Sequence, residues 1–274
     1  SRFKQDHTSG CVHIMTDAAG SISRETAQEF GITLLDSYIT AGDKSLPETL
    51  FHPQVLYKMM RSDIAVSSSQ ASVFERHQHY ESAVNQYPRV LYLCVGSFYT
   101  GNYEVALKWK QAHDKEDRFT VIDTGAASGR LATPVMATVR FSTRTDDPDQ
   151  VVAFARAAVD QCEEYVFLDK LQYLAAGGRL SKSSAFFGDL LHMKPVISPL
   201  PQGATKVGVV RNQKAQLDFA RSRLQNRFSK EAAPLIMLQY TDNEPWVREG
   251  VREAIATEYP CAEILLHPLS LTSS

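Results

Sequence analysis

Four hydroxyl side chains and one amide are packed into residues 66–72, which read VSSSQAS. The segment carries no acid, base or metal-binding side chain. Hydroxyls and exposed backbone N–H groups at a helix start can bind a carboxylate or phosphate, helped by the helix dipole. Ser72 and Glu75 also fit a capping box, which explains Ser72 without any ligand. A cap leaves Ser68, Ser69 and Gln70 unexplained, so an anion-binding role stays open for them.

A second polar segment, VGSFYTGNYEVA, occupies residues 95–106 and follows an apolar run. Two glycines permit a tight backbone and three side chains offer hydrogen bonds: Gly96 and Gly101, and Ser97, Thr100 and Asn102. The segment is neither the nucleophile elbow G-x-S-x-G nor a P-loop, because it lacks both patterns. A ligand-binding loop and a plain strand-to-helix turn both remain open.

The remaining candidate groups do not assemble into a catalytic or metal site. Asp17 and Asp123 each end a strand-like run, where carboxylates often cap turns but can also act as acid or base. Arg179 follows paired glycines and could grip an anion or a partner, or simply be solvated. His77 and His79 are two apart on an expected helix and so face different ways. We expect no metal site and no cofactor.

Strand and helix patterns alternate through the first half of the chain. Apolar runs predict strands at 12–17, 32–39, 89–96 and 118–125. Amphipathic stretches predict helices at 21–31, 53–62, 71–87, 103–114 and 127–141. This alternation indicates a parallel sheet flanked by helices, in which ligands bind beyond the carboxyl ends of the strands. The polar segments after the strands are therefore the expected binding positions: Asp17, Ser68–Ser72, Ser97–Asn102 and Asp123–Ser128.

The second half reads as mixed α/β, with two strands joined by PQGA as a hairpin. The polar segment TRTDDPDQ at 143–150 is a plausible hinge. We therefore predict a two-lobed α/β protein, with an N-terminal lobe at 12–147 and a C-terminal lobe at 148–274. Both ends of the sequence look cut, so we expect a part of a longer protein.

Composition narrows the class of protein. The 274 residues carry a net charge of −2, which gives no electrostatic case for nucleic acid. No apolar run approaches the roughly 18 residues of a membrane span, so we expect no transmembrane segment. The four cysteines are widely spaced and fit buried free thiols, which indicates a reducing, cytoplasmic location.

Taken together, the motifs resemble those of the DegV family, bacterial fatty-acid-binding proteins that serve a fatty acid kinase. The resemblance spans nearly the whole chain from Val12. Six segments carry it in order: IMTDAAGSIS, SSQAS, VGSFYTGNYEVA, VIDTGAAS, LQYLAAGGRLSKSSAFFGDLLHMKPVI and VVRNQKAQ. In the third of these, Gly96 stands where the family motif has its first serine.

The resemblance implies a binder of a long-chain fatty acid rather than an enzyme. The carboxylate would be held by hydroxyl loops, at Ser68, Ser69, Gln70, Ser97, Thr100 and Gly101. An apolar tunnel would take the acyl chain, at about 0.8 kcal/mol per buried CH₂. Further contacts to the pocket or partner would come from Asp17, Phe98, Arg179 and Arg211. Phosphorylation would belong to a partner kinase or a fused kinase-like domain.

Two other hypotheses about the function remain open. The first is a hydrolase or transferase acting on a small acyl or phosphorylated substrate, with Asp17 or Asp123 as acid or base and Ser97 in the site. The second is a regulatory or interaction domain of a larger chain, whose pocket is degenerate.

Overall fold

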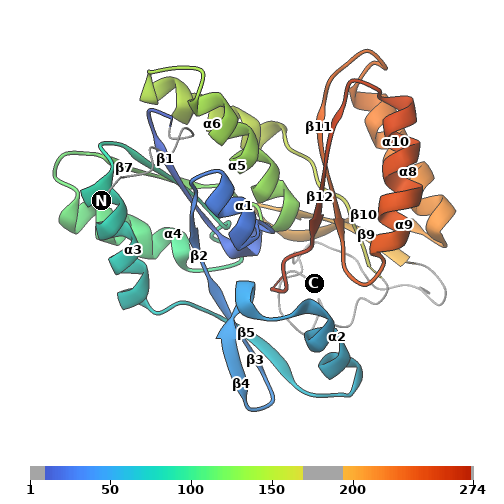
Figure 1. The fold of residues 1–274 in the computed structure, drawn as a ribbon, viewed down its shortest axis with the longest axis horizontal. Coiled ribbons are helices and arrows are strands. Elements are labelled where there is room, and N and C mark those ends of the chain that lie inside the picture. Colours follow the sequence, from blue (N-terminus) through green and yellow to red (C-terminus); the bar gives the residue numbers. More distant parts are fainter. Residues whose placement is uncertain (1–9, 169–193, 273–274) are drawn as a thin grey trace, which may run out of the picture. The chain divides into compact units, whose positions relative to one another are not determined.

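A four-stranded parallel sheet forms the centre of the first part of the chain, in the order β2-β1-β6-β7 (Figure 1). The computed structural model describes residues 10–168 and 194–272. The strands are β1 (His13–Asp17), β2 (Thr33–Leu35), β6 (Val90–Cys94) and β7 (Phe119–Asp123). Every residue of β6 is buried, as expected for a central strand covered on both faces. The predicted parallel sheet flanked by helices is confirmed.

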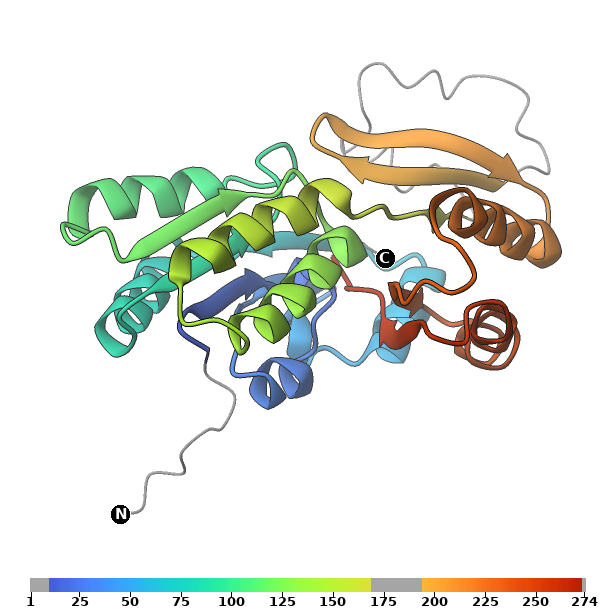
Figure 2. The same cartoon turned by 90° about the horizontal axis from the view of Figure 1, so that it is seen from above.

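Helices follow the strands and begin at the caps that the sequence suggests. The Ser23 side chain caps α1 (Arg24–Glu29), and Ser72 caps α3 (Val73–Gln86) by accepting from the Glu75 N–H. Further along are α4 (Asn102–His113), α5 (Ser128–Ser142) and α6 (Pro148–Gln161). The last two lie side by side (Figure 2). The stacked rings of Phe141 and Phe154 join them, with centroids 4.3 Å apart.

A small antiparallel sheet in the order β4-β3-β5 differs from the prediction. Its strands are β3 (Ser37–Ala41), β4 (Lys44–Pro47) and β5 (Val66–Gln70). A 3₁₀ turn (Glu48–Leu50) and helix α2 (Pro53–Arg61) lie between β4 and β5. The single strand expected at 32–39 is wrong: the chain passes from β2 into β3 at Asp36, whose carboxylate accepts from Thr49 N–H at 3.1 Å and Arg24 at 2.9 Å.

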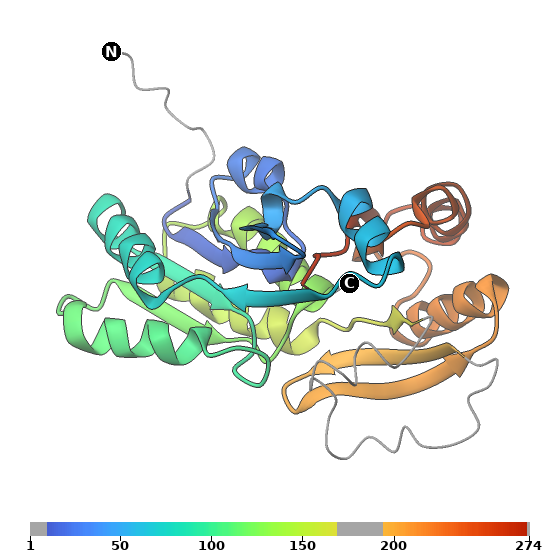
Figure 3. The ribbon, with the colours of Figure 1, turned by 90° about the horizontal axis from the view of Figure 1, so that it is seen from below.

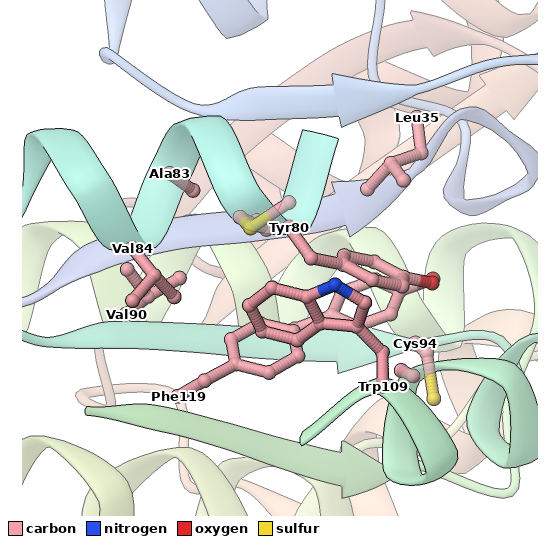
Figure 4. Packing of buried hydrophobic residues seen from close by; sticks show 11 residues of the cluster. Leu35, Tyr80, Ala83, Val84, Val90, Cys94, Trp109 and Phe119 are labelled. Atoms are coloured by element: carbon pink, nitrogen blue, oxygen red, sulfur yellow. The ribbon is translucent and has the colours of Figure 1, made fainter. Parts of the chain in front are cut away.

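Aromatic rings fill the core between the sheet and helices α3 and α4. Tyr80, Trp109 and Phe119 come from α3, α4 and β7, and their ring centroids lie 5.3–5.7 Å apart (Figure 4). Val84, Val90 and other small apolar residues close the cluster around them. The packing joins elements that are distant in sequence, so it holds helices α3 and α4 against the sheet.

The chain divides into two compact units. Unit 1 extends to Cys162 and includes the chain again from Leu269 onward. Unit 2 comprises residues 163–268. The predicted boundary at 147–148 instead falls between α5 and α6, both in unit 1. The C-terminal residues return to unit 1, where Ser270 N–H donates to Ser21 Oγ at 2.9 Å and the Thr272 hydroxyl donates to buried Glu48 at 2.9 Å.

Unit 2 is mixed α/β, as predicted. A three-stranded antiparallel sheet has the order β10-β9-β8 and includes the expected hairpin (Figure 3). A second sheet pairs β11 and β12 in parallel. The strands are β8 (Val166–Phe167), β9 (Lys194–Leu200), β10 (Gly203–Val210), β11 (Leu235–Tyr240) and β12 (Glu263–Pro268). Helices are α8 (Gln213–Arg227), α9 (Glu244–Trp246) and α10 (Arg252–Glu258), with a π-helical turn (Val247–Val251) before the last. Within the described ranges, no helix has the length and apolarity that crossing a membrane requires.

Replacing Phe119 tests the aromatic core. Phe119 is fully buried, so Phe119→Ala should lower the free energy of unfolding by about 3–5 kcal/mol through lost contacts and a cavity. Phe74→Ala is the matched control, because Phe74 is 74% exposed and its loss should change stability by less than about 0.5 kcal/mol. Urea unfolding followed by circular dichroism measures both. Equal effects of the two substitutions would contradict this account of the core.

Candidate functional site

The hydroxyl-rich segment is a strand and not the helix-start loop that the sequence suggested. It pairs with β3 in the register Ile39↔Ser68 and Ser37↔Gln70. Paired residues of a sheet share a face, so Ser68 and Gln70 lie on the side of buried Ser37 and Ile39. Ser69 is exposed on the opposite face. Ser68, Ser69 and Gln70 therefore do not form one cluster.

Gln70 accepts hydrogen bonds from side chains of three other elements. Its Oε1 accepts from Arg76 Nη2 and Asn102 Nδ2, both at 3.0 Å, and from Ser37 Oγ at 3.4 Å. Asn102 is the first residue of α4 and is 2% exposed. This contact joins the hydroxyl strand to the polar segment after β6, two motifs that lie apart in the sequence.

The segment after β6 makes a tight turn before α4. Tyr99 N–H donates to Gly96 O at 2.8 Å, and Asn102 N–H donates to Thr100 Oγ1 at 3.3 Å. Gly101 is exposed, and a Cβ added there would meet no atom within 4 Å. Phe98 is 41% exposed beside this turn. The predicted residues of this motif thus border open space, next to the Gln70 contact.

The turns after β6 and β7 are pinned together. Asp123 Oδ1 accepts from Ser97 N–H at 3.0 Å and from Gly125 N–H at 3.1 Å. Gly96 N–H donates to Ala126 O at 2.8 Å. A Cβ on Gly96 would lie 2.6 Å from the backbone of Gly125, so any side chain there would force the turns apart. The serine of the family motif cannot occupy this position without moving the turn after β7.

Asp17 lies at the end of β1 and is completely buried. Its Oδ1 accepts from Tyr92 OH at 2.7 Å and from Arg76 Nη2 at 3.3 Å, and its Oδ2 accepts from Val95 N–H at 2.8 Å. Arg76 is 1% exposed and also donates to Tyr92 OH at 3.1 Å. Both carboxylate oxygens accept hydrogen bonds within the protein, which indicates a structural role for Asp17.

Burial and the neighbouring charges shift the pKa values of Arg76 and Tyr92. Burial is the largest single influence on the pKa of Arg76 and lowers it, but the Asp17 carboxylate together with Tyr92 and Tyr80 raises that pKa above its ordinary value. Burial, followed by the nearby Asp17 charge, raises the pKa of Tyr92 well above its usual range. Arg76 is therefore a permanent buried cation, held by Asp17 on one side and Gln70 on the other.

Other predicted positions lie elsewhere. Arg179 is outside the described residues. Arg211 is exposed between β10 and α8, in unit 2.

A cavity of about 350 Å³ in unit 2 is lined by none of the predicted residues; its walls are Glu163, Tyr165, Arg223, Asn226 and Arg227. Across 10–168 and 194–272, no group of three or more His, Cys, Asp or Glu side chains could hold a metal ion.

Sequence reasoning missed Arg76 and underrated Asn102. Arg76 lies on an amphipathic helix, where a charged residue is normally assigned to the exposed face. Arg76 lies one helical turn after the Ser72 cap, and this spacing directs its side chain back toward the end of β5. That spacing was the sequence feature that could have indicated its role. Asn102 looked like one polar residue among several in a turn.

Breaking the buried ion pair tests its structural role. Asp17→Asn leaves Arg76 as an uncompensated buried charge, so the free energy of unfolding should fall by about 3–5 kcal/mol. The control is Asp149→Asn, which breaks an exposed pair with Arg89 (3.2 Å) and should cost no more than about 1 kcal/mol. Thermal and urea unfolding of both variants provide the comparison. A loss at Asp17 as small as that at Asp149 would refute the structural assignment.

The close approach of the two turns predicts a contrast between glycines. Gly96→Ala should destabilise the protein by about 1–3 kcal/mol, because the methyl group collides with the Gly125 backbone. Gly101→Ala should change stability by less than about 0.5 kcal/mol, since the space is open and the φ of −82° suits alanine. Urea unfolding distinguishes them, and two equal midpoints would rule out the crowding argument.

Comparison with known proteins places the chain in a family. The DegV family model matches residues 11–274. A curated DegV domain-containing protein from Caldanaerobacter subterraneus subsp. tengcongensis is 23% identical over 248 residues, covering 90% of this chain and 88% of the relative.

Two solved structures have the same fold. DegV from Bacillus subtilis, described as a fatty acid binding protein, matches with a TM-score of 0.80 at 16% identity, over 97% of this chain and 94% of that one. The fatty acid kinase (Fak) B3 protein of Streptococcus pneumoniae, loaded with linoleic acid, matches with a TM-score of 0.79 at 19% identity, over 94% and 92%. The predicted DegV-like fold is confirmed, and this chain belongs to the DegV family.

Proposed function

We propose that the protein binds a long-chain fatty acid and presents it to a fatty acid kinase. The carboxylate would be received beside Gln70, with Ser68 on the same face of β5 and Ser97, Thr100 and Gly101 from the turn after β6. The proposal is supported by the ligands of its relatives: the B3 protein from Streptococcus pneumoniae was solved with linoleic acid bound.

The observation that carries the proposal is the Gln70–Asn102 hydrogen bond. It brings two polar motifs together at the carboxyl end of the parallel sheet, where ligands of such folds bind. An anion removed from water needs hydrogen-bond donors around it. Within the described residues, the Ser68 hydroxyl has no hydrogen-bond partner, and the Ser97 side chain is exposed. These hydroxyls are thus available to a ligand.

The same geometry favours binding over catalysis. Asp17 is buried in an ion pair, and Asp123 holds two backbone N–H groups. A general base must reach a substrate proton, and a nucleophilic serine needs such a base beside it. The Asp17 carboxylate that the enzyme hypothesis required is engaged within the protein, and the exposed Asp123 shapes the two turns through its Oδ1 atom. Phosphoryl transfer therefore falls to a partner kinase in our proposal, which also retains the cytoplasmic location indicated by the cysteines.

Serines on the two faces of β5 provide a matched test. Ser68→Ala should weaken fatty-acid binding by about tenfold, because a hydrogen bond to a charged group is worth about 1.5–3 kcal/mol. Ser67→Ala is the control, since Ser67 is exposed on the opposite face of the same strand. Displacement of a fluorescent fatty acid by tetradecanoic acid gives both dissociation constants, and equal values would remove Ser68 from the site.

Native mass spectrometry of gently purified protein tests the function itself. We expect a co-purified long-chain fatty acid, or stoichiometric uptake after one is added. Apo protein that takes up no added fatty acid would refute the proposal.

A further inference from the structure

We propose that Gln70 selects an ionised carboxylate over a neutral headgroup, because Arg76 and Asn102 lock its amide with the NH₂ group turned toward the ligand. The inference rests on the proposed function and adds a residue-level cause of headgroup specificity. It makes Gln70 the specificity-determining donor, and Arg76 and Asn102 its positioning residues.

The orientation of the Gln70 amide is fixed through its oxygen atom. A carbonyl oxygen has two lone pairs, and here three donors point at it within 3.4 Å: Arg76 Nη2, Asn102 Nδ2 and Ser37 Oγ. A planar carboxamide carries its oxygen and its NH₂ on opposite sides. Fixing Oε1 against these donors therefore fixes Nε2 in the other direction.

The reversed orientation is strongly disfavoured. It would place the Gln70 NH₂ against a guanidinium and another amide NH₂, so that donors face donors. Arg76 cannot turn away, because its guanidinium is held by Asp17 at 3.3 Å and by Tyr92 OH at 3.1 Å. Asn102 is buried at the first position of α4, which restricts its own side chain. The polarity of the Gln70 amide is thus set by a buried framework.

The outward NH₂ is unused by the part of the chain that the structure describes. Gln70 is half-buried and its Nε2 has no hydrogen-bond partner among residues 10–168 and 194–272. Partly desolvated donors gain most from a charged acceptor. The permanent charge of Arg76 is already balanced by Asp17, so a ligand carboxylate would be bound mainly by directed hydrogen bonds.

The near-isosteric substitution Gln70→Glu keeps the acceptor oxygen and removes the NH₂ donor. In Gln70→Glu one carboxylate oxygen still accepts from Arg76, Asn102 and Ser37, so the framework is kept. The second oxygen replaces the NH₂ and presents a negative charge to the ligand. A fatty acid is then repelled, whereas a fatty alcohol can donate its hydroxyl proton to the new oxygen.

The experiment measures dissociation constants for tetradecanoic acid and 1-tetradecanol, by displacement of a fluorescent fatty acid from the full chain. Gln70→Glu should weaken acid binding at least about tenfold and leave alcohol binding within about threefold, so the acid-to-alcohol preference falls. Ser67→Asp controls for charge alone, because it places a carboxylate on the exposed opposite face of β5. It should leave the preference unchanged.

Asn102→Ala supplies a second variant that keeps Gln70 intact. Loss of one locking donor should reduce the acid-to-alcohol preference by about three- to tenfold, whereas a purely structural loss would weaken both ligands equally. If the wild type binds neither ligand, the proposed function fails. If the wild type binds the acid and Gln70→Glu keeps the same preference, the function stands and the inference is overturned. An equal loss of both ligands in Asn102→Ala would overturn the positioning role.

Discussion

The buried ion pair between Asp17 and Arg76 is the interaction on which the candidate site depends. Asp17 ends β1, Arg76 lies on α3, and the Tyr92 hydroxyl from β6 joins them, so three elements are tied at one point. Because Arg76 also donates to Gln70, the same pair orients the end of β5 relative to the parallel sheet. Removing two charges from water costs free energy, and the additional hydrogen bonds to the pair offset that cost.

Groups at this edge of the sheet divide into those that build it and those that remain available. Asp17, Asp123 and Asn102 form hydrogen bonds within the protein, and Gly96 permits the two turns to approach. Ser68, Ser97 and the Gln70 NH₂ face outward or lack a partner in the described residues. A site whose buried acid is structural and whose hydroxyl and amide groups are available as donors is suited to holding an anion.

Much of the fold was predictable, because apolar runs and caps act locally. β6 and the Ser72 cap follow directly from the sequence. β5 did not, since a serine-rich segment becomes a strand only through its pairing with β3, which is a non-local interaction. The same pairing puts Ser69 on the outer face. The unit boundary was misplaced because only tertiary packing reveals that α6 lies on α5, and the burial of Arg76 depends on the distant Asp17.

A crystal structure of the protein with a bound long-chain fatty acid tests the central claim most directly. Our account predicts a carboxylate oxygen within hydrogen-bond distance of Gln70 Nε2, with Gln70 Oε1 still facing Arg76 and Asn102. A carboxylate bound away from Gln70, for instance at the cavity lined by Arg223 and Arg227, would contradict it.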